Sequence, residues 1–389
     1  MKGTSGSKLA NMYFFRTIFR NIYQNKFFTI INILGLAIGL SCAIFIILYL
    51  QDELTYDRHH ENHKRIYRLE SDFTISDKSQ QVAKTPFPFG PAFLMEFHEI
   101  EAFTRFREID KTSFRHNGQS FYTSNAFYAD SSIFEIFSHT FIYGTPANAL
   151  TGTNTMVLTR SFSERLFGKD DPVGKFVVMG NGLRCMVTAV IEDPPGNSHV
   201  RFEALVSMVS YSKIIGEKMY NDLNTKHFGA IRLYTYVLLE KNATMESIIK
   251  KFPVFYDKYM DEFGQQLNGS FRLMATPIAD IHLKTNLGWD FEVGNMTNIY
   301  IFSLIAVFIL LIAAINYMNL ATARSSLKAK EVGVRKVLGA SRWHLIRLFL
   351  AESIIQTLVA LVFGLLLVEL FLPLINDISG KQLSLEYLG

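Results

Sequence analysis

Two short stretches of the sequence hold residue types that could do chemistry. The first, His59-His60-Glu61-Asn62-His63, offers imidazoles and a carboxylate that could bind a metal ion. The helix of a zinc metalloprotease needs two residues between its glutamate and its second histidine, so that both histidines face the metal. Only one residue separates Glu61 from His63, so this geometry fails. We therefore expect the polar start of a helix here rather than a metal site.

The second stretch has the glycines and the lysine of a phosphate-binding loop. Gly168 and Gly174 precede Lys175, but five residues lie between the glycines, where the loop needs four. Phe176 also stands where a serine or threonine hydroxyl must reach magnesium. This pattern predicts a surface turn. The two cysteines, Cys42 and Cys185, are too few for a disulfide framework or a four-cysteine zinc site. We expect a non-enzymatic chain with no catalytic residue, metal or cofactor of its own.

The composition points to a membrane protein. Of the 389 residues, 49% are hydrophobic and 19% are charged, with a mean hydropathy of +0.16, whereas soluble domains have about a quarter of charged residues. Three apolar blocks, 28–50, 299–321 and 354–372, are long enough for membrane-spanning helices, which need about 20 residues. The net charge of +4 gives no indication of a nucleic-acid partner.

The basic residues beside these blocks predict the orientation of the chain, because cytoplasmic flanks are rich in lysine and arginine. Basic residues without any acid precede the first span, and residues 322–350 after the second span hold seven basic residues with Glu331 as the single acid. Residues 1–27 and 322–353 are therefore predicted to be cytoplasmic, and residues 51–298 and 373–389 to be outside. Residues 1–27 form either an amphipathic segment at the lipid interface or a simple positive flank.

The first span carries small residues on one face, namely Gly35, Gly39 and Ala43. Small side chains let helix backbones approach closely in lipid, so we favour a helix-packing face. The alternative is that glycine is simply common in membrane spans.

Residues 51–298 are numerous enough to form a core of their own. Runs rich in β-branched and aromatic residues predict strands at 155–158, 176–178, 185–191 and 233–239. Helical patterns predict helices at 91–97, 160–167 and 245–259. The expected fold is an α-helical membrane protein with a large extracytoplasmic α+β domain between spans one and two.

The most specific stretch is cytoplasmic and reads Glu331-Val332-Gly333-Val334-Arg335-Lys336-Val337-Leu338-Gly339-Ala340. It resembles the coupling loop of MacB/FtsX-type ABC-transporter permeases, whose pattern is close to E-[IV]-G-[VI]-R-K-x-[LI]-G-A, and the match is unbroken. Residues 51–57 and 65–68 resemble the segment that opens the outer domain in this family. Residues 128–137, 158–175, 193–199 and 281–283 resemble its MacB-like periplasmic core domain.

The resemblance implies a permease subunit in the bacterial inner membrane, with two periplasmic α+β subdomains. Such a subunit couples ATP hydrolysis by a separate ABC ATPase, which binds the ATP, to movement of its outer domain. The other implied partners are a second permease copy, membrane lipid and a periplasmic adaptor. Family members carry four spans, so we expect this chain to be an N-terminal part that lacks the fourth span.

The same resemblance gives roles to the coupling residues. Glu331 is suited to a salt bridge or a capping contact with the ATPase, Gly333 to close backbone approach and Gly339 to a helix end. Arg335 and Lys336 would meet acidic ATPase residues or lipid phosphates. The alternative for these charges is a topogenic positive flank without a partner. The alternative for the whole protein is a membrane-anchored sensor that controls a cell-wall enzyme or a kinase.

Overall fold

The computed structural model describes residues 16, 20, 23, 26–75, 78–266, 269–323, 325–339 and 341–385. The chain divides into two compact units. The helical unit consists of Met1–Asp52 and Met296–Gly389, and the sheet unit consists of Glu53–Asn295.

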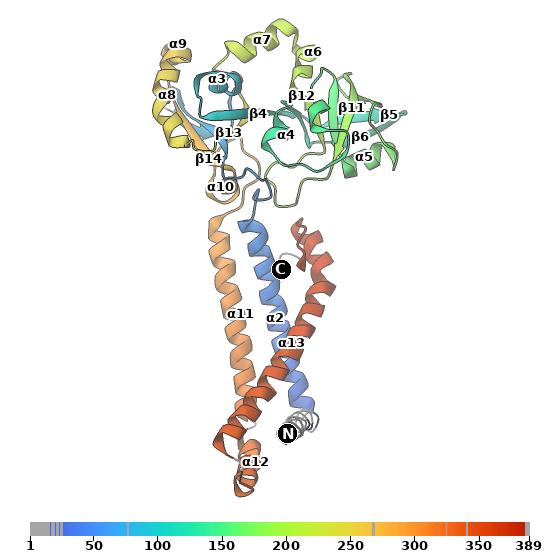
Figure 1. The fold of residues 1–389 in the computed structure, drawn as a ribbon, viewed down its shortest axis with the longest axis vertical. Coiled ribbons are helices and arrows are strands. Elements are labelled where there is room, and N and C mark those ends of the chain that lie inside the picture. The colour runs from blue at the N-terminus through green and yellow to red at the C-terminus, as the bar shows by residue number, and fades with distance from the viewer. Residues whose placement is uncertain are drawn as a thin grey trace, which may run out of the picture. The chain divides into compact units, whose positions relative to one another are not determined.

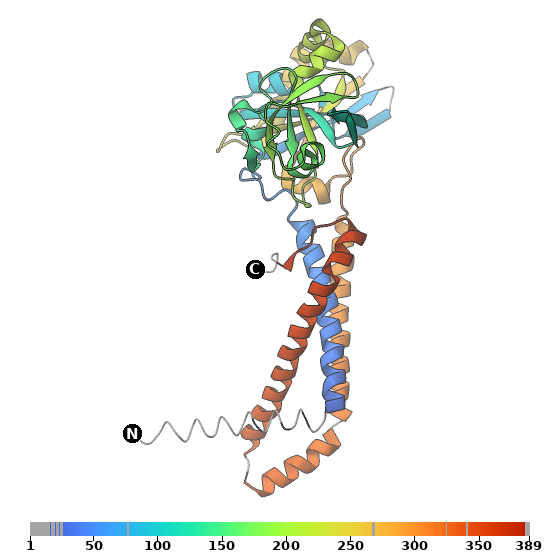
Figure 2. The same ribbon diagram turned by 90° about the vertical axis from the view of Figure 1, so that its right-hand side faces the viewer.

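The helical unit contains three helices that are long and apolar enough to cross a membrane, counted over the described residues. They are α2 (Lys26–Leu54), α11 (Met296–Ala323) and α13 (Arg342–Ser379), and the shorter α12 (Ser325–Val337) lies between the last two. Figure 2 shows α2 and α11 side by side along their length, with α13 crossing them at an angle. These helices confirm the membrane part of the predicted fold class. Helix α13 begins at Arg342, as the longer helical pattern around the predicted span of 354–372 indicates, and ends at Ser379.

The strands of the sheet unit form one mixed sheet with the order β14-β1-β13-β4-β7-β12-β9-β11-β10-β5-β6, and β2, β3 and β8 pair at its sides. The pairs β7–β12 and β9–β11 are parallel and the other pairs are antiparallel. The strands are β1 (Ile66–Ile75), β2 (Lys78–Val82), β3 (Thr85–Pro86), β4 (Ile100–Ile109), β5 (Thr112–His116), β6 (Gln119–Thr123), β7 (Ala126–Ala129), β8 (Phe141–Tyr143), β9 (Thr155–Thr159), β10 (Phe176–Met179), β11 (Arg184–Ile191), β12 (Ala204–Ser207), β13 (Ile231–Leu239) and β14 (Gly269–Pro277).

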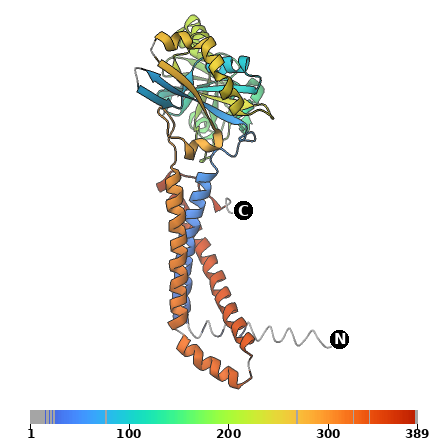
Figure 3. The same ribbon diagram turned by 90° about the vertical axis from the view of Figure 1, so that its left-hand side faces the viewer.

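Helices cover the sheet at both of its ends (Figure 1). The helices are α3 (Phe89–Glu96), α4 (Ile133–Ile136), α5 (Arg160–Phe167), α6 (Ser212–Ile215), α7 (Glu217–Thr225), α8 (Met245–Tyr259), α9 (Asp261–Gln266) and α10 (Ile278–Lys284). At the β14–β1–β13 end, α3 and α8 lie against the sheet (Figure 3) and contribute an aromatic core that includes Phe89, Phe93, Phe252 and Phe255. At the β11–β10–β5 end, the core includes Phe162 of α5 and Phe114 of β5. A third cluster includes Phe106 and Tyr236, and its residues alternate along β7, β9 and β12 with those of the Phe162 cluster. This α+β unit confirms the second part of the predicted fold class.

The local predictions hold in the sheet unit, with one exception. Helices α5 and α8 have the predicted bounds, α3 overlaps the predicted 91–97 but begins at Phe89 and ends at Glu96, and strands β9, β10, β11 and β13 contain the four predicted runs. The exception is the stretch His59-His60-Glu61-Asn62-His63, which forms turns instead of the start of a helix. The turns begin because α2 ends at Leu54 and Asp57 takes a left-handed backbone with φ of 58°. Such a residue interrupts a right-handed helix.

Candidate functional site

The predicted coupling residues lie on α12 and in the turn that follows it. Val332, Gly333, Val334, Arg335 and Lys336 are helical, and so is the backbone of Glu331. The side chain of Glu331 and all of Ala340 lie outside the described residues.

Apolar side chains at the end of α12 face outward. Val334, Val337 and Leu338 are 56%, 89% and 80% exposed, and Trp343 at the start of α13 is 72% exposed. Contiguous exposed apolar residues mark a surface that contacts protein or lipid. We call Val334, Val337 and Leu338 the apolar tip of α12.

A tight turn separates α12 from α13. Gly339 has φ of +91°, which favours glycine, and its backbone N donates to Lys336 O at 3.0 Å. Ser341 then caps α13, because its hydroxyl accepts a hydrogen bond from His344 N at 3.2 Å. Glycine after a helix and serine before the next one are the usual end and start signals. The sequence therefore fixes the length of α12 through Gly339 and Ser341.

Gly35 and Gly39 of α2 face α11. A Cβ added at Gly39 would lie 2.6 Å from Ala313 Cβ, which is closer than real carbon contacts. A Cβ at Gly35 would lie 3.0 Å from the side chain of Asn316. On α13, a Cβ at Gly364 would lie 3.2 Å from Ala37 O of α2. Ala43 is 2% exposed. Helix α2 thus approaches both other long helices at glycine positions.

The third span also carries two buried polar residues that the sequence analysis did not single out. Glu352 and Gln356 are 2% and 3% exposed, and Gln356 Nε2 lies 3.5 Å from Glu352 Oε1. The sequence does contain a sign of this pair, since a four-residue spacing places both polar side chains on one face of an apolar helix.

In the sheet unit, buried polar contacts fasten the residues after α2 to the loop that follows β11. Asp57 Oδ1 accepts hydrogen bonds from His199 N at 3.1 Å and Ser198 Oγ at 3.2 Å. Asp57 Oδ2 lies 2.8 Å from His199 Nδ1, and these side chains are 0% and 1% exposed. His199 Nε2 lies 2.7 Å from Tyr236 Oη on β13. This chain of contacts ties the first turn of the unit to the centre of its sheet.

A second set of contacts joins the two ends of the sheet unit. Glu53 Oε2 lies 2.9 Å from His282 Nε2 of α10, and the Tyr56 ring stacks on the His282 imidazole with centroids 3.4 Å apart. Gly294 N donates to His282 O at 2.8 Å. We call Glu53, Tyr56, Asp57, His199 and His282 the polar clamp. Glu53 lies in the last turn of α2, and Gly294 lies shortly before α11. The clamp therefore holds residues that are adjacent in the chain to both helices.

A buried arginine ties the segment that leads into α11 to strand β1. Arg68 of β1 is fully buried, and its guanidinium lies 2.6 Å from Asp290 Oδ1 and 2.8 Å from Glu70 Oε1. Asp290 belongs to the segment between α10 and α11. Removing one member of such a buried group is costly, since it leaves an uncompensated charge.

Burial shifts the ionisation of the groups near the clamp. Burial alone would raise the pKa of Asp57, but contact with His199 outweighs it, so the pKa is lower than usual. Burial and then the neighbouring His59 lower the pKa of His60 to about 3. Desolvation lowers the pKa of His139 to about 4. His60 and His139 are therefore neutral at pH 7. Among the described residues, no three histidine, cysteine or acidic side chains are grouped to hold a metal ion.

The sequence alone does not indicate the clamp as a unit. Residues 51–57, 193–199 and 281–283 resemble the family only as separate segments, and Asp57 and His199 lie 142 positions apart. Local spacing says nothing about such long-range contacts. The available signal was weak, because 51–57 carries acids without a histidine, while 193–199 and 281–283 each carry one histidine.

Comparison with protein families decides the relationship. Residues 29–253 match the family model of the MacB-like periplasmic core domain, and residues 303–388 match that of the FtsX-like permease C-terminal region. The chain belongs to the MacB/FtsX-type permeases. It is therefore a membrane permease of the ABC-transporter type, with a domain of a periplasmic family.

Several known proteins are similar to this chain. The chain is 22% identical over 363 residues to the macrolide export ATP-binding/permease protein MacB of Wolinella succinogenes, covering 89% of this chain and 52% of MacB. It thus spans about half the length of that curated relative. A domain of a putative permease from Porphyromonas gingivalis shares the fold, with a TM-score of 0.51, 17% identity and coverage of 62% of this chain and 98% of that domain. The periplasmic region of MacB from Actinobacillus actinomycetemcomitans gives a TM-score of 0.39 at 14% identity, covering 56% of this chain and 90% of that one.

Proposed function

We propose that this MacB/FtsX-type permease couples ATP hydrolysis by a separate ABC ATPase subunit to movement of its extracytoplasmic domain. The observation that carries the proposal is the coupling segment. It is an independent helix, α12, that links two membrane helices, ends sharply at Gly339 and exposes the apolar tip. A positive flank needed only for orientation requires neither a defined helix end nor exposed valine and leucine side chains.

The basic and acidic residues of α12 complete the proposed ATPase contact. Glu331 is the single acid among seven basic residues in 322–350, and Arg335 and Lys336 lie one turn further on. In this proposal Glu331 pairs with a cation of the ATPase, while the apolar tip enters a groove of that subunit. The ATPase binds the ATP, and this chain supplies no cofactor.

The polar clamp supports the second half of the proposal. Glu53 and Gly294, next to the ends of α2 and α11, are held together by His282. A displacement of either helix end therefore reaches the sheet unit through one buried, hydrogen-bonded site, so the unit is moved as a body. We place a second permease copy, membrane lipid and a periplasmic adaptor among the partners, and the inner membrane as the location.

Two substitutions test the coupling role. Glu331→Lys inverts the charge of the proposed contact, and losing one partner of a buried interfacial charge pair costs about 2–5 kcal/mol. Gly339→Val places a β-branched side chain at φ of +91°, which strains the end of α12. We expect both variants to insert normally and to lose most of the co-purifying ATPase and its ATP hydrolysis.

The matched control is Glu240→Lys, the same charge inversion at an exposed position of the sheet unit. The tagged full chain is purified from the membranes of the cells that make it, and bound ATPase is measured by ATP turnover. If ATPase association survives both Glu331→Lys and Gly339→Val, the loop is only a positive flank. The sensor interpretation would then be preferred.

A further inference from the structure

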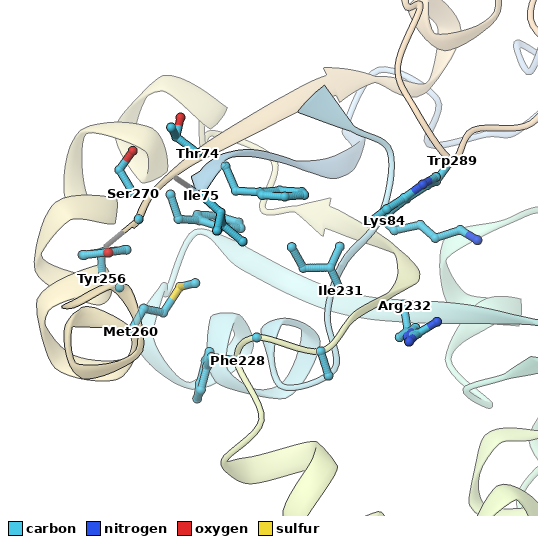
Figure 4. Close-up of a pocket in the computed structure, with 16 residues that line it drawn as sticks. Thr74, Ile75, Lys84, Phe228, Ile231, Arg232, Tyr256, Met260, Ser270 and Trp289 are labelled. Carbon is cyan, nitrogen blue, oxygen red and sulfur yellow. The ribbon is translucent and has the colours of Figure 1, made fainter. Parts of the chain in front are cut away.

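A cavity of about 580 Å³ opens in the sheet unit, beside the β14–β1 edge of the sheet. Its walls come from the ends of β1 and β14, from α8, and from the segment that leads into β13 (Figure 4). Cavities of 300–1,000 Å³ are the size that holds small organic ligands. None of the residues that line it belongs to α12 or to the polar clamp, so the proposed coupling mechanism does not use it.

The lining of the cavity is aromatic and aliphatic. Phe73 and Phe271 lie opposite each other on paired strands, and Phe228, Tyr256 and Trp289 close the other sides. Aromatic walls favour flat or flexible apolar groups through dispersion and π-contacts. The body of a matching ligand is therefore apolar.

The charged residues of the lining are both basic. Lys84 already pairs with Glu108 and lies over the Tyr234 ring. Arg232 is exposed, and within the described residues no ion pair or hydrogen bond occupies its guanidinium. Among the residues that the structure describes, no acidic side chain lines the cavity. A guanidinium at the rim of an apolar cavity recognises a carboxylate, phosphate or sulfate group.

The backbone of Trp289 gives an independent indication of a ligand site. Trp289 is 49% exposed, yet it has φ of +55°, a conformation that is costly for a bulky side chain. Its neighbours hold it there: Gly288 N donates to Gln81 O at 2.9 Å, and Tyr234 Oη donates to Trp289 O at 2.9 Å. Strain of this kind is concentrated at ligand clamps and active sites. Here it keeps the indole at the wall of the cavity.

We infer that this cavity binds a small amphipathic monoanion, with its apolar body between the aromatic walls and its acidic group on Arg232. The inference does not depend on the ATPase or on the coupling segment.

The test uses the full chain in phosphatidylcholine nanodiscs and 2-naphthoate as the probe, with binding measured by calorimetry against empty nanodiscs. We expect saturable binding of one naphthoate per chain, and at least tenfold weaker binding of 2-naphthylmethylammonium. Arg232→Gln should weaken naphthoate binding about tenfold, as loss of a charge-assisted contact does. Arg115→Gln, on an exposed arginine of β5 outside the cavity, is the control and should bind normally.

Trp289→Asn separates a ligand role from a structural one. Asparagine tolerates a left-handed backbone, so the melting temperature should stay the same or rise, while naphthoate binding is lost with the indole. The inference is overturned if naphthoate gives no saturable heat, if binding survives Trp289→Asn, or if Arg232→Gln binds as tightly as the unchanged chain.

Discussion

At the scale of single residues, the histidines near the polar clamp decide how the fold responds to pH. His60 is 3% exposed, and its Nδ1 accepts a hydrogen bond from Ser138 N at 3.2 Å, which the neutral ring can do and the protonated ring cannot. His59 and His139 lie against it, with ring centroids 3.9 and 6.3 Å away, so a positive charge there would also meet other imidazoles.

We predict that the sheet unit loses stability as the pH falls from about 6.5 toward 4. The unfolded chain protonates His60 near pH 6.5, whereas the folded chain does so only near pH 3. The unfolded state therefore binds more protons in this window, which costs up to about 1.4 kcal/mol per pH unit. His60→Gln, whose side-chain oxygen can accept from Ser138 N, should flatten the fall in melting temperature, and exposed His98→Gln should not. An unchanged slope in the His60→Gln variant would contradict the assignment.

At the scale of elements, α2 approaches α11 closely at Gly39. Gly39→Ala adds a methyl group 2.6 Å from Ala313 Cβ, so the helices must separate or shift. We predict a clear loss of thermal stability in detergent, since overpacking typically costs about 1–3 kcal/mol. Gly35→Ala should cost less, because its methyl group meets the end of the Asn316 side chain, which can move. Adding Ala313→Gly to Gly39→Ala should restore stability, and failure of this rescue would show that the contact does not control helix packing.

Among the elements, those with a strong local pattern could be predicted from the sequence. Helices α5 and α8 follow directly from their patterns, because their apolar residues recur at helical spacing toward buried cores. Thr244 is the N-cap residue of α8, although its side chain makes no capping hydrogen bond. The turns at 59–63 were missed because their conformation depends on Asn197 O, which accepts from Asp57 N. The single sheet path, and with it the polar clamp and the cavity, needs strand pairings between residues far apart in sequence, such as β1 with β14.

At the scale of the whole molecule, the predicted orientation rests on the charges that flank the membrane helices. The 322–353 segment is rich in basic residues, and the sheet unit carries acids and bases in comparable numbers. Because basic flanks are retained in the cytoplasm, this asymmetry predicts that α12 is cytoplasmic and that the sheet unit is outside. The proposed coupling depends on that separation, since an ATPase contact and a periplasmic movement cannot share one side.

Labelling of single cysteines tests this orientation. Cys185 itself is unsuitable, because it is fully buried and burial raises the pKa of its thiol to about 12, which suppresses the reactive thiolate. We therefore replace Cys42 and Cys185 by alanine and introduce either Lys241→Cys or Lys336→Cys, both at exposed positions. In spheroplasts, a membrane-impermeant maleimide should label position 241 directly and position 336 only after permeabilisation. The chain without cysteines is the control and should remain unlabelled. Labelling of position 336 in intact spheroplasts would reverse the orientation and remove the basis for a cytoplasmic ATPase contact.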